Sequence, residues 1–463
     1  MPKFIVRDRA FYSTLFRLAL PISLQSFVTF GISFTANLMV GRLGESAIAG
    51  VHMGNQLPLL LGFYVTGIDA ALVIIAAQYW GRQDTVSIKK LISIALRLSL
   101  LGGLLLFTCT LLIPDKMIGI FTPNPDIIAV GVVYVRILAF SFPFFCISQI
   151  LISSMRSVEN VKIGLLISVT ALGCNLVLGY VLIFGASGLP GMGVTGAALA
   201  AVISRMIECG IIILYVLKAD QKLRIRIKDL LSWDPMLFRD FARFGLPVLG
   251  GNIVWAVNTL TQSGIIGRMS TEAVASVSIT GMLNNLIFVW VMGLGAGVGI
   301  ITSKTVGAGK YEEMKLYAKT VQILFAALGV VSGALIYLLM NPFLSLYALS
   351  GETIVVARQF MTVMAIAGVG RCYQATCLAG LVKAGGDTSF VFKNDTIFVF
   401  GVVLPSALIA QFVFGAPPWV VYACLQSDQI LKCFVALVKI NSFNWMKNLT
   451  RNSTEDDKLA VEQ

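Results

Sequence analysis

Long runs of apolar residues, separated by short polar segments, make up most of this chain. A membrane-spanning helix needs about 20 predominantly apolar residues. Twelve runs of that kind lie roughly at 15–39, 52–78, 91–113, 130–153, 162–184, 193–217, 244–266, 275–302, 317–340, 355–381, 388–413 and 417–438. The pattern predicts an all-α membrane protein with twelve transmembrane helices, six in each half of the chain.

The two halves repeat one another in register. Pro21 returns as Pro247 (247 − 21 = 226), and Gly81 returns at the same offset as Gly307. Further matches at this offset are Gly41 with Gly267, Arg42 with Arg268, Gly67 with Gly293 and Lys89 with Lys315. Repeats built from membrane spans are typical of secondary transporters. Because each half has an even number of helices, both enter the membrane from the same side, which predicts two six-helix bundles related by a pseudo-twofold along the membrane normal.

Composition agrees with a membrane protein, because 57% of the residues are hydrophobic, 13% are charged and the mean hydropathy is +0.86. The net charge of +12 does not predict nucleic-acid binding, since the basic residues alternate from loop to loop. They gather before the first span, after the second, fourth, sixth and eighth spans, and in the C-terminal tail. By the positive-inside rule, both termini are cytoplasmic in a multi-pass protein of the inner (cytoplasmic) cell membrane.

The spans and charges together predict four parts. An N-terminal six-helix bundle covers 1–217, a cytoplasmic linker 218–240, a C-terminal six-helix bundle 241–440, and a polar cytoplasmic tail 441–463. The linker is basic, and a short helix within it would lie on the membrane surface.

Recognised catalytic and metal-binding motifs are missing from the sequence. His52 is the single histidine, which excludes paired-histidine metal sites. The segment Gly307-Ala-Gly-Lys310 does not have the spacing of a phosphate-binding loop. The eight cysteines fall inside predicted spans without metal spacing, so they are interpreted as packing residues. We therefore expect neither an enzyme nor a resident metal or cofactor.

Polar side chains inside the spans are the candidates for a substrate or ion pathway, because they are costly in hydrocarbon. Asp69 is the first of them, since it lies 13 residues before Arg82 (82 − 69 = 13), about 20 Å along a helix and near the bilayer midplane. It either serves transport or bonds to a neighbouring helix. The other candidates are Gln25, Asn37, Asn175, Glu208, Asn258, Gln262, Asn284 and Arg371. Each of these could instead join helices through hydrogen bonds.

Two pairs of opposite charges have helical spacing. Arg205 and Glu208 are three positions apart, and Asp428 and Lys432 are four apart, which places each pair on one helix face. Structural neutralisation is the favoured interpretation of both pairs. Two further charges have no partner nearby in sequence and either pair with each other across helices or line a cavity: Arg371 and Asp395.

Four motifs carry a resemblance to a known family. They are Asn37-Leu-Met-Val-Gly-Arg-Leu-Gly44, Ala77-Gln-Tyr-Trp-Gly-Arg82, Gly191-Met-Gly-Val-Thr-Gly-Ala-Ala-Leu-Ala200 and Lys383-Ala-Gly-Gly-Asp-Thr388. They resemble the MATE (multidrug and toxic compound extrusion) transporters, bacterial branch, over nearly the whole chain. The resemblance implies twelve helices in two six-helix bundles. It also implies an antiporter that exports amphipathic, often cationic organic compounds while Na⁺ or H⁺ enters.

The chain departs from this family at two acidic positions. The Asp that the family commonly has in the first helix is replaced by Ala36, and the N-x-x-x-D of the fifth helix reads Asn175-Leu-Val-Leu-Gly179. The coupling ion, Na⁺ or H⁺, therefore stays open. Asp69 is then expected to be the most consequential acid of the N-terminal half, with Glu208 as the next candidate.

The expected function is a secondary antiporter that works by alternating access. Its expected partners are a small-molecule substrate and membrane lipid, with no nucleic acid, and a monomer is expected. The main alternative is a flippase for a lipid-linked precursor, which resembles this architecture but usually lines its cavity with several Arg and Lys, whereas Arg371 is almost alone here. An intramembrane enzyme and a channel are two further candidate functions.

Overall fold

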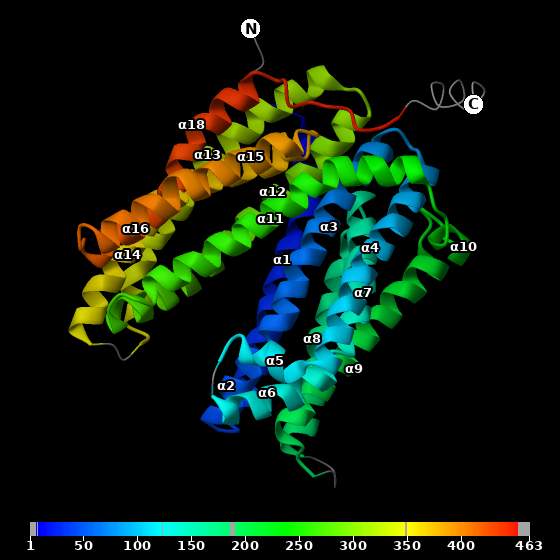
Figure 1. Ribbon diagram of the computed structural model, residues 1–463. Helices are drawn as coiled ribbons and strands as arrows, with labels where there is room; N and C mark the ends of the chain where they lie inside the picture. The colour runs from blue at the N-terminus through cyan, green and yellow to red at the C-terminus, as the bar shows by residue number, and fades with distance from the viewer. Residues whose placement is uncertain (1–5, 7, 123, 186–189, 348–349, 452–463) are drawn as a thin grey trace. The chain divides into compact units, whose positions relative to one another are not determined.

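The structure is a computed structural model that describes residues 6, 8–122, 124–185, 190–347 and 350–451, without the side chains at 33, 34, 37, 38, 45, 46 and 271. The described chain is helical, with one isolated bridge between Gly386 and Met446. It forms two compact units, which we treat separately (Figure 1). The N unit is Leu24–Ala76 with Asp84–Gly245, and the C unit is Met1–Ser23, Ala77–Gln83 and Leu246–Gln463.

The helices account for the twelve predicted spans. Among the described residues, ten helices are long and apolar enough to cross a membrane, and one bent pair adds an eleventh. The twelfth span is α11 (Pro235–Ile266), a continuous helix of 32 residues, whose apolar character is diluted by Asn252, Asn258 and Gln262. The protein is therefore an all-α membrane protein with six spans in each half.

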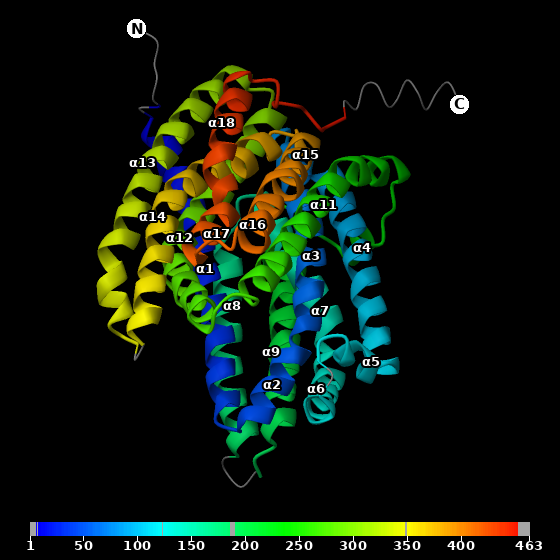
Figure 2. The same ribbon diagram turned by 60° about the vertical axis from the view of Figure 1, so that its left-hand side comes forward.

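The N unit contains α1 from Leu24 onward, α2, α3 up to Ala76, and the helices from α4 to the beginning of α11. Local signals in the sequence set several boundaries, since the Asp84 carboxylate accepts from the Ser87 backbone N–H at 3.0 Å to begin α4, and Asn124 with Pro125 begins α6. Figure 2 shows α8 and α9 running side by side. The bounds are α1 (Arg9–Gly41), α2 (Glu45–Gly54), α3 (Gln56–Gly81), α4 (Thr85–Leu112), α5 (Pro114–Gly119), α6 (Pro125–Leu138), α7 (Ser141–Ser157), α8 (Lys162–Phe184), α9 (Gly193–Leu214), the π-helical η1 (Tyr215–Ala219) and α10 (Ile227–Leu230).

The span predicted at 130–153 is bent rather than straight, because α6 and α7 meet at 53°. At the bend the Ser141 hydroxyl donates to the Leu138 carbonyl at 2.6 Å, a local bond that competes with the helical ladder. Both residues line the main cavity of the N unit. The bend therefore shapes that cavity.

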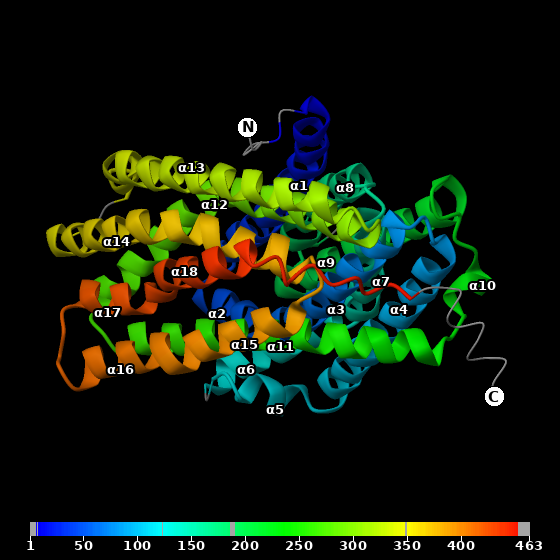
Figure 3. The same ribbon diagram turned by 90° about the horizontal axis from the view of Figure 1, so that it is seen from above.

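The C unit contains the rest of the chain, and Figure 3 shows α13 and α14 side by side within it. Its hydrogen-bond ladder is interrupted by two π-helical segments, which the apolar pattern does not reveal. The bounds are α12 (Thr271–Gly307), α13 (Tyr311–Leu344), α14 (Gly351–Ala375), η2 (Thr376–Lys383), α15 (Thr388–Phe398), η3 (Val399–Val403), α16 (Leu404–Phe412), α17 (Pro418–Leu425) and α18 (Ser427–Asn441).

Gly81 and Gly307, which are equivalent positions of the repeat, each lie against the backbone of the other's helix inside the C unit. A Cβ on Gly81 would lie 2.1 Å from the Lys304 carbonyl oxygen, and a Cβ on Gly307 would lie 2.1 Å from the Gln78 carbonyl oxygen. Gln78 and Lys304 are themselves 226 positions apart (304 − 78 = 226). The contact is therefore reciprocal, as a local twofold relation between the ends of α3 and α12 requires, and glycine is needed on both sides.

The first part of the C-terminal tail is bound to the C unit. Trp445 is fully buried, and the Gln78 side chain bonds to the backbone of Lys447 and Leu449 at 3.2 and 2.7 Å. The Asp387 carboxylate, just before α15, bonds to Lys439 and Lys447 at 2.8 Å each. These bonds fix residues 445–450 against the ends of α3 and α15.

Candidate functional site

The N unit encloses a cavity of about 520 Å³ between α1, α2, α3, α6, α7, α8 and α9. One part of its wall is apolar and includes Leu59, Phe142 and Phe145. The polar part consists of His52, Asn55, Gln56, Tyr134, Ser141, Asn175, Ser204, Arg205 and Glu208. A cavity of this size, with an apolar wall and a few convergent polar groups, suits a small organic molecule.

An ion pair supplies the charge of this cavity. The Glu208 side chain is buried, and its Oε2 lies 2.6 Å from Arg205 Nη1 on the preceding turn of α9. The Arg205 side chain is 33% exposed, and its guanidinium lies 5.1 Å from the centre of the Phe145 ring. Among the described residues that line the cavity, Glu208 is the only carboxylate. The predicted Arg205–Glu208 pair is therefore present, and it faces the cavity.

The two positions that lack the acids of the resembled family come together next to this cavity. Ala36 of α1 and Gly179 of α8 both line a smaller hollow of about 50 Å³. That hollow shares Asn55, Tyr134 and Asn175 with the main cavity. Asn55 Oδ1 accepts a hydrogen bond from the Tyr134 hydroxyl at 3.1 Å. Side-chain amides and a phenol, rather than carboxylates, therefore surround the place where Ala36 and Gly179 meet.

Asp69 belongs to a different polar cluster of the N unit. Its Oδ2 accepts from the Ser153 hydroxyl of α7 at 3.2 Å, and it interacts electrostatically with the partly buried Arg156. Arg156 Nη2 in turn donates to Gln25 Oε1 of α1 at 2.8 Å. Asp69 and Gln25 thus join α1, α3 and α7, and neither is among the residues that line the two hollows.

The charges of the C unit neutralise one another around Lys432. Its ammonium lies 2.9 Å from Asp395 Oδ1 and 3.1 Å from Asp428 Oδ2, and the side chains of Lys432 and Asp428 are buried. Asp395, which could have paired with Arg371, pairs instead with Lys432. The Arg371 guanidinium lies 5.0 Å from the centre of the Phe288 ring and makes no ion pair with the described residues.

The remaining candidates of the C unit lie on two helices, α11 and α12. Asn258 Oδ1 accepts from Gln262 Nε2 at 3.2 Å, one turn later on α11. Asn284 is buried on α12, and its Oδ1 has no hydrogen-bond partner within the described chain. In the N unit, Asn175 lines both hollows, whereas the side chain of Asn37 lies outside the described residues.

Several lining residues were not among the sequence candidates, namely His52, Asn55, Tyr134 and Ser204. Helical spacing would have found one of them, because Ala201, Ser204, Arg205 and Glu208 follow the i, i+3, i+4, i+7 pattern of a single helix face. Ser204 Oγ is buried without a hydrogen-bond partner in the described chain. No comparable signal marks Asn55 or Tyr134, which meet only through the fold.

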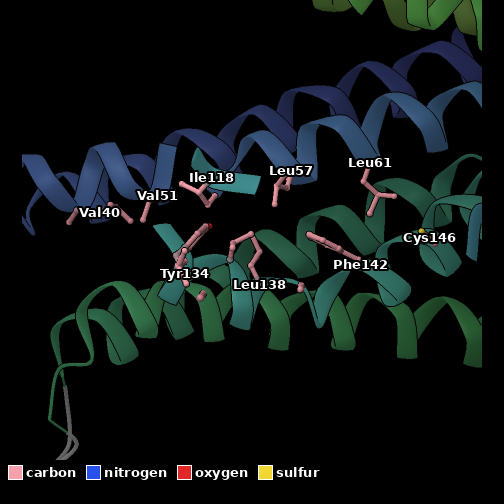
Figure 4. Close-up of a cluster of buried hydrophobic side chains, with 14 of the residues drawn as sticks. Val40, Val51, Leu57, Leu61, Ile118, Tyr134, Leu138, Phe142 and Cys146 are labelled. Carbon is pink, nitrogen blue, oxygen red and sulfur yellow. The ribbon is translucent and has the colours of Figure 1, made fainter. Parts of the chain in front are cut away.

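A buried apolar cluster supports the cavity from one side. Figure 4 shows Val51, Leu57 and Leu61 of α2 and α3 opposite Tyr134, Leu138 and Phe142 of α6 and α7. The last three residues belong to both the cluster and the cavity wall. Packing in this cluster therefore fixes the side chains that shape the cavity.

Fold and cavity together define a duplicated, twelve-span helical membrane protein whose N-terminal half encloses a small-molecule-sized hollow. The MatE family model matches residues 21–181 and 247–409, once in each half. The match covers well over half of the sequence, so the chain belongs to the MatE family.

Individual relatives are similar over most of their length. A probable multidrug resistance protein NorM of Streptococcus pneumoniae R6 is 26% identical over 86% of this chain and 88% of its own. The multidrug resistance protein PmpM of Pseudomonas aeruginosa is 24% identical over 86% of this chain and 84% of its own. A solved MOP superfamily transporter from Pyrococcus furiosus has a TM-score of 0.81 at 18% identity, over 93% of this chain and 96% of that one, which shows a shared fold.

Proposed function

We propose that this protein is a secondary antiporter that exports amphipathic, cationic organic compounds by alternating access. The observation that carries the proposal is the N-unit cavity, whose apolar wall suits a flat organic molecule and whose one carboxylate suits a cation. Membership of the MatE family supports it, as do relatives named as multidrug resistance proteins. Export then requires the cavity to be reached alternately from the two sides of the membrane.

We assign the coupling role to Glu208 and the coupling ion to H⁺. A hard cation such as Na⁺ is held by several oxygen ligands at once, and the hollow beside the cavity has Ala36 and Gly179 where carboxylates would be needed. A proton needs one acceptor only. Protonation of Glu208 would break its pair with Arg205 and leave the positive charge of Arg205 uncompensated in the cavity, which disfavours a cationic substrate, so proton and substrate compete for one group.

The charges of the C unit favour the same assignment. Asp395 and Asp428 already hold the Lys432 ammonium, which occupies the position that a free cation would take between two carboxylates. Asp69 is bonded to Ser153, and we assign it a structural role between α3 and α7. Glu208, by contrast, lines the N-unit cavity, and its partner Arg205 is partly exposed.

Transport into proteoliposomes tests this proposal. With an ethidium-like cationic dye, an imposed pH gradient should drive accumulation, and an imposed sodium gradient at equal pH should not. Accumulation driven by sodium alone would contradict the assignment of the ion. Dye flux that does not saturate and does not depend on either gradient would contradict the proposal of an antiporter and favour a channel.

We also propose that both termini are cytoplasmic, on the basis of the alternating basic loops. In a variant without native cysteines, a cysteine at the exposed Met192 should react with an impermeant thiol reagent in intact cells, whereas one at the exposed Gln83 should react only after lysis. The reverse pattern would overturn this topology.

A further inference from the structure

A second hollow of the N unit lies outside the membrane-spanning helices, where the linker folds against the beginning of α4. It measures about 500 Å³, and four cationic side chains and one carboxylate line it: Lys89, Lys222, Arg224, Arg226 and Asp229. The transport cycle proposed above makes no use of this site. Its concentration of positive charge calls for a negatively charged occupant.

The linker presents its arginines by burying the residues between them. Leu223 and Ile225 are each 2% exposed, whereas Arg224 and Arg226 are exposed. Arg224 has a φ of 49°, a left-handed backbone conformation that is uncommon outside glycine. The buried pair therefore anchors a backbone whose basic side chains point into the hollow.

The single carboxylate of the hollow is already engaged. Asp229 Oδ2 accepts from the Arg226 backbone N–H at 2.9 Å and lies 3.0 Å from the Lys89 ammonium. The backbone bond, together with Lys89, lowers the pKa of Asp229 against the opposing effect of burial. Lys89 also donates to the Arg224 carbonyl at 3.3 Å. Among the described residues, neither guanidinium, of Arg224 or of Arg226, forms an ion pair.

Apolar side chains beside the hollow place it at the membrane surface. Ile227, Leu231 and Trp233 are 64%, 70% and 48% exposed, on a segment that joins the end of one span at Ala219 to the beginning of α11 at Pro235. Figure 1 shows α10 at the edge of the N unit, next to α4. Exposed apolar residues next to basic ones are typical of segments that lie in the lipid interface, and Trp is enriched there.

We propose that this linker hollow binds the phosphate group of an anionic phospholipid from the adjacent leaflet. Arg224 and Arg226 hold the phosphate oxygens, since a guanidinium matches phosphate geometry with paired N–H donors. Ile227, Leu231 and Trp233 contact the acyl chains.

Lipid binding to the full-length protein in detergent tests the proposal, with phosphatidylglycerol, phosphatidylcholine and inorganic phosphate as probes. Wild-type protein should retain phosphatidylglycerol in preference to phosphatidylcholine. The double variant Arg224→Gln/Arg226→Gln should lose roughly tenfold or more in phosphatidylglycerol affinity. Lys228→Gln is the matched control, because Lys228 is an exposed cation of the same segment that does not line the hollow, and it should bind as wild type does.

Two outcomes of the binding experiment would overturn the proposal. Equal phosphatidylglycerol affinity in the double variant and the wild type would show that Arg224 and Arg226 do not bind the lipid. Binding of inorganic phosphate as tight as that of phosphatidylglycerol would show that the occupant of the hollow is a soluble anion. A second measurement, backbone amide hydrogen exchange of residues 221–229 in the wild-type protein, needs no variant. It should slow with phosphatidylglycerol and not with phosphatidylcholine, and equal exchange with both lipids would contradict the proposal.

Discussion

Glu208→Gln tests the role of this carboxylate in both substrate binding and coupling, because it keeps the shape of the side chain and removes its charge. Glu208 Oε2 lies 2.6 Å from Arg205 Nη1, so the variant leaves Arg205 without its carboxylate. Breaking a fully buried pair costs about 3–5 kcal/mol, and an exposed pair is worth about 0–1 kcal/mol. Since the Arg205 side chain is 33% exposed, we expect a stability loss between these limits, of about 1–2 kcal/mol.

The effect on transport should be larger than the effect on stability. A bond to a charged group contributes about 1.5–3 kcal/mol, so loss of the carboxylate should weaken binding of a cationic dye by about 10- to 100-fold. Gradient-driven accumulation in proteoliposomes should disappear, because no group then exchanges a proton for the dye. In wild-type protein dye affinity should fall as the pH is lowered, and in the variant it should not depend on pH.

Two further variants serve as controls for this experiment. Arg205→Gln/Glu208→Gln replaces the ion pair by two neutral amides, so it should recover stability and remain uncoupled. Asp69→Asn alters an intramembrane acid that does not line the cavity, and it should keep gradient-driven accumulation. Normal accumulation in Glu208→Gln at matched incorporation, or its loss in Asp69→Asn alone, would refute the assignment.

Three more predictions concern packing, the tail and the missing acids. Gly307→Ala should lower the thermal unfolding temperature, with a cost of about 1–3 kcal/mol, because its Cβ would lie 2.1 Å from a backbone carbonyl; Gly281→Ala, on the same helix with open space around it, should not. Asp387→Asn should destabilise the protein by about 1–3 kcal/mol at neutral pH. Burial opposes ionisation of Asp387, but its bonds to two lysines lower its pKa below the ordinary 3.8. The difference in free energy of unfolding between the wild type and Asp387→Asn should therefore shrink as the pH falls below about 4. An unchanged difference at low pH would contradict this prediction. Ala36→Asp should make dye transport respond to a sodium gradient, because it returns a carboxylate to the hollow that contains Asn55 and Asn175; transport indifferent to sodium would contradict that reasoning.

The apolar runs and the internal repeat predicted most of the fold, because each membrane span is one continuous stretch of sequence. The span predicted at 162–184 coincides with α8, and the 226-residue register reappears as the reciprocal contact of Gly81 and Gly307. The bend between α6 and α7 was not predicted, since apolar runs carry no information about direction.

The site was predicted only where its contacts are local. The Arg205–Glu208 pair follows from helical spacing along α9. The bond between Lys432 and Asp395 joins different helices, and the meeting of Ala36 with Gly179 depends on how α1 packs against α8. Asp69 was favoured by its depth along a helix, a quantity that does not reveal which face of the helix meets a cavity.

Proton release on substrate binding tests the central claim most directly. Purified protein in weakly buffered detergent solution, titrated with the cationic dye at a series of acidic pH values, should release a proton as the dye binds. Glu208→Gln should bind the dye more weakly and release none. Equal proton release by the wild type and this variant would show that another group exchanges the proton, and binding without release by the wild type would contradict proton-coupled export through Glu208.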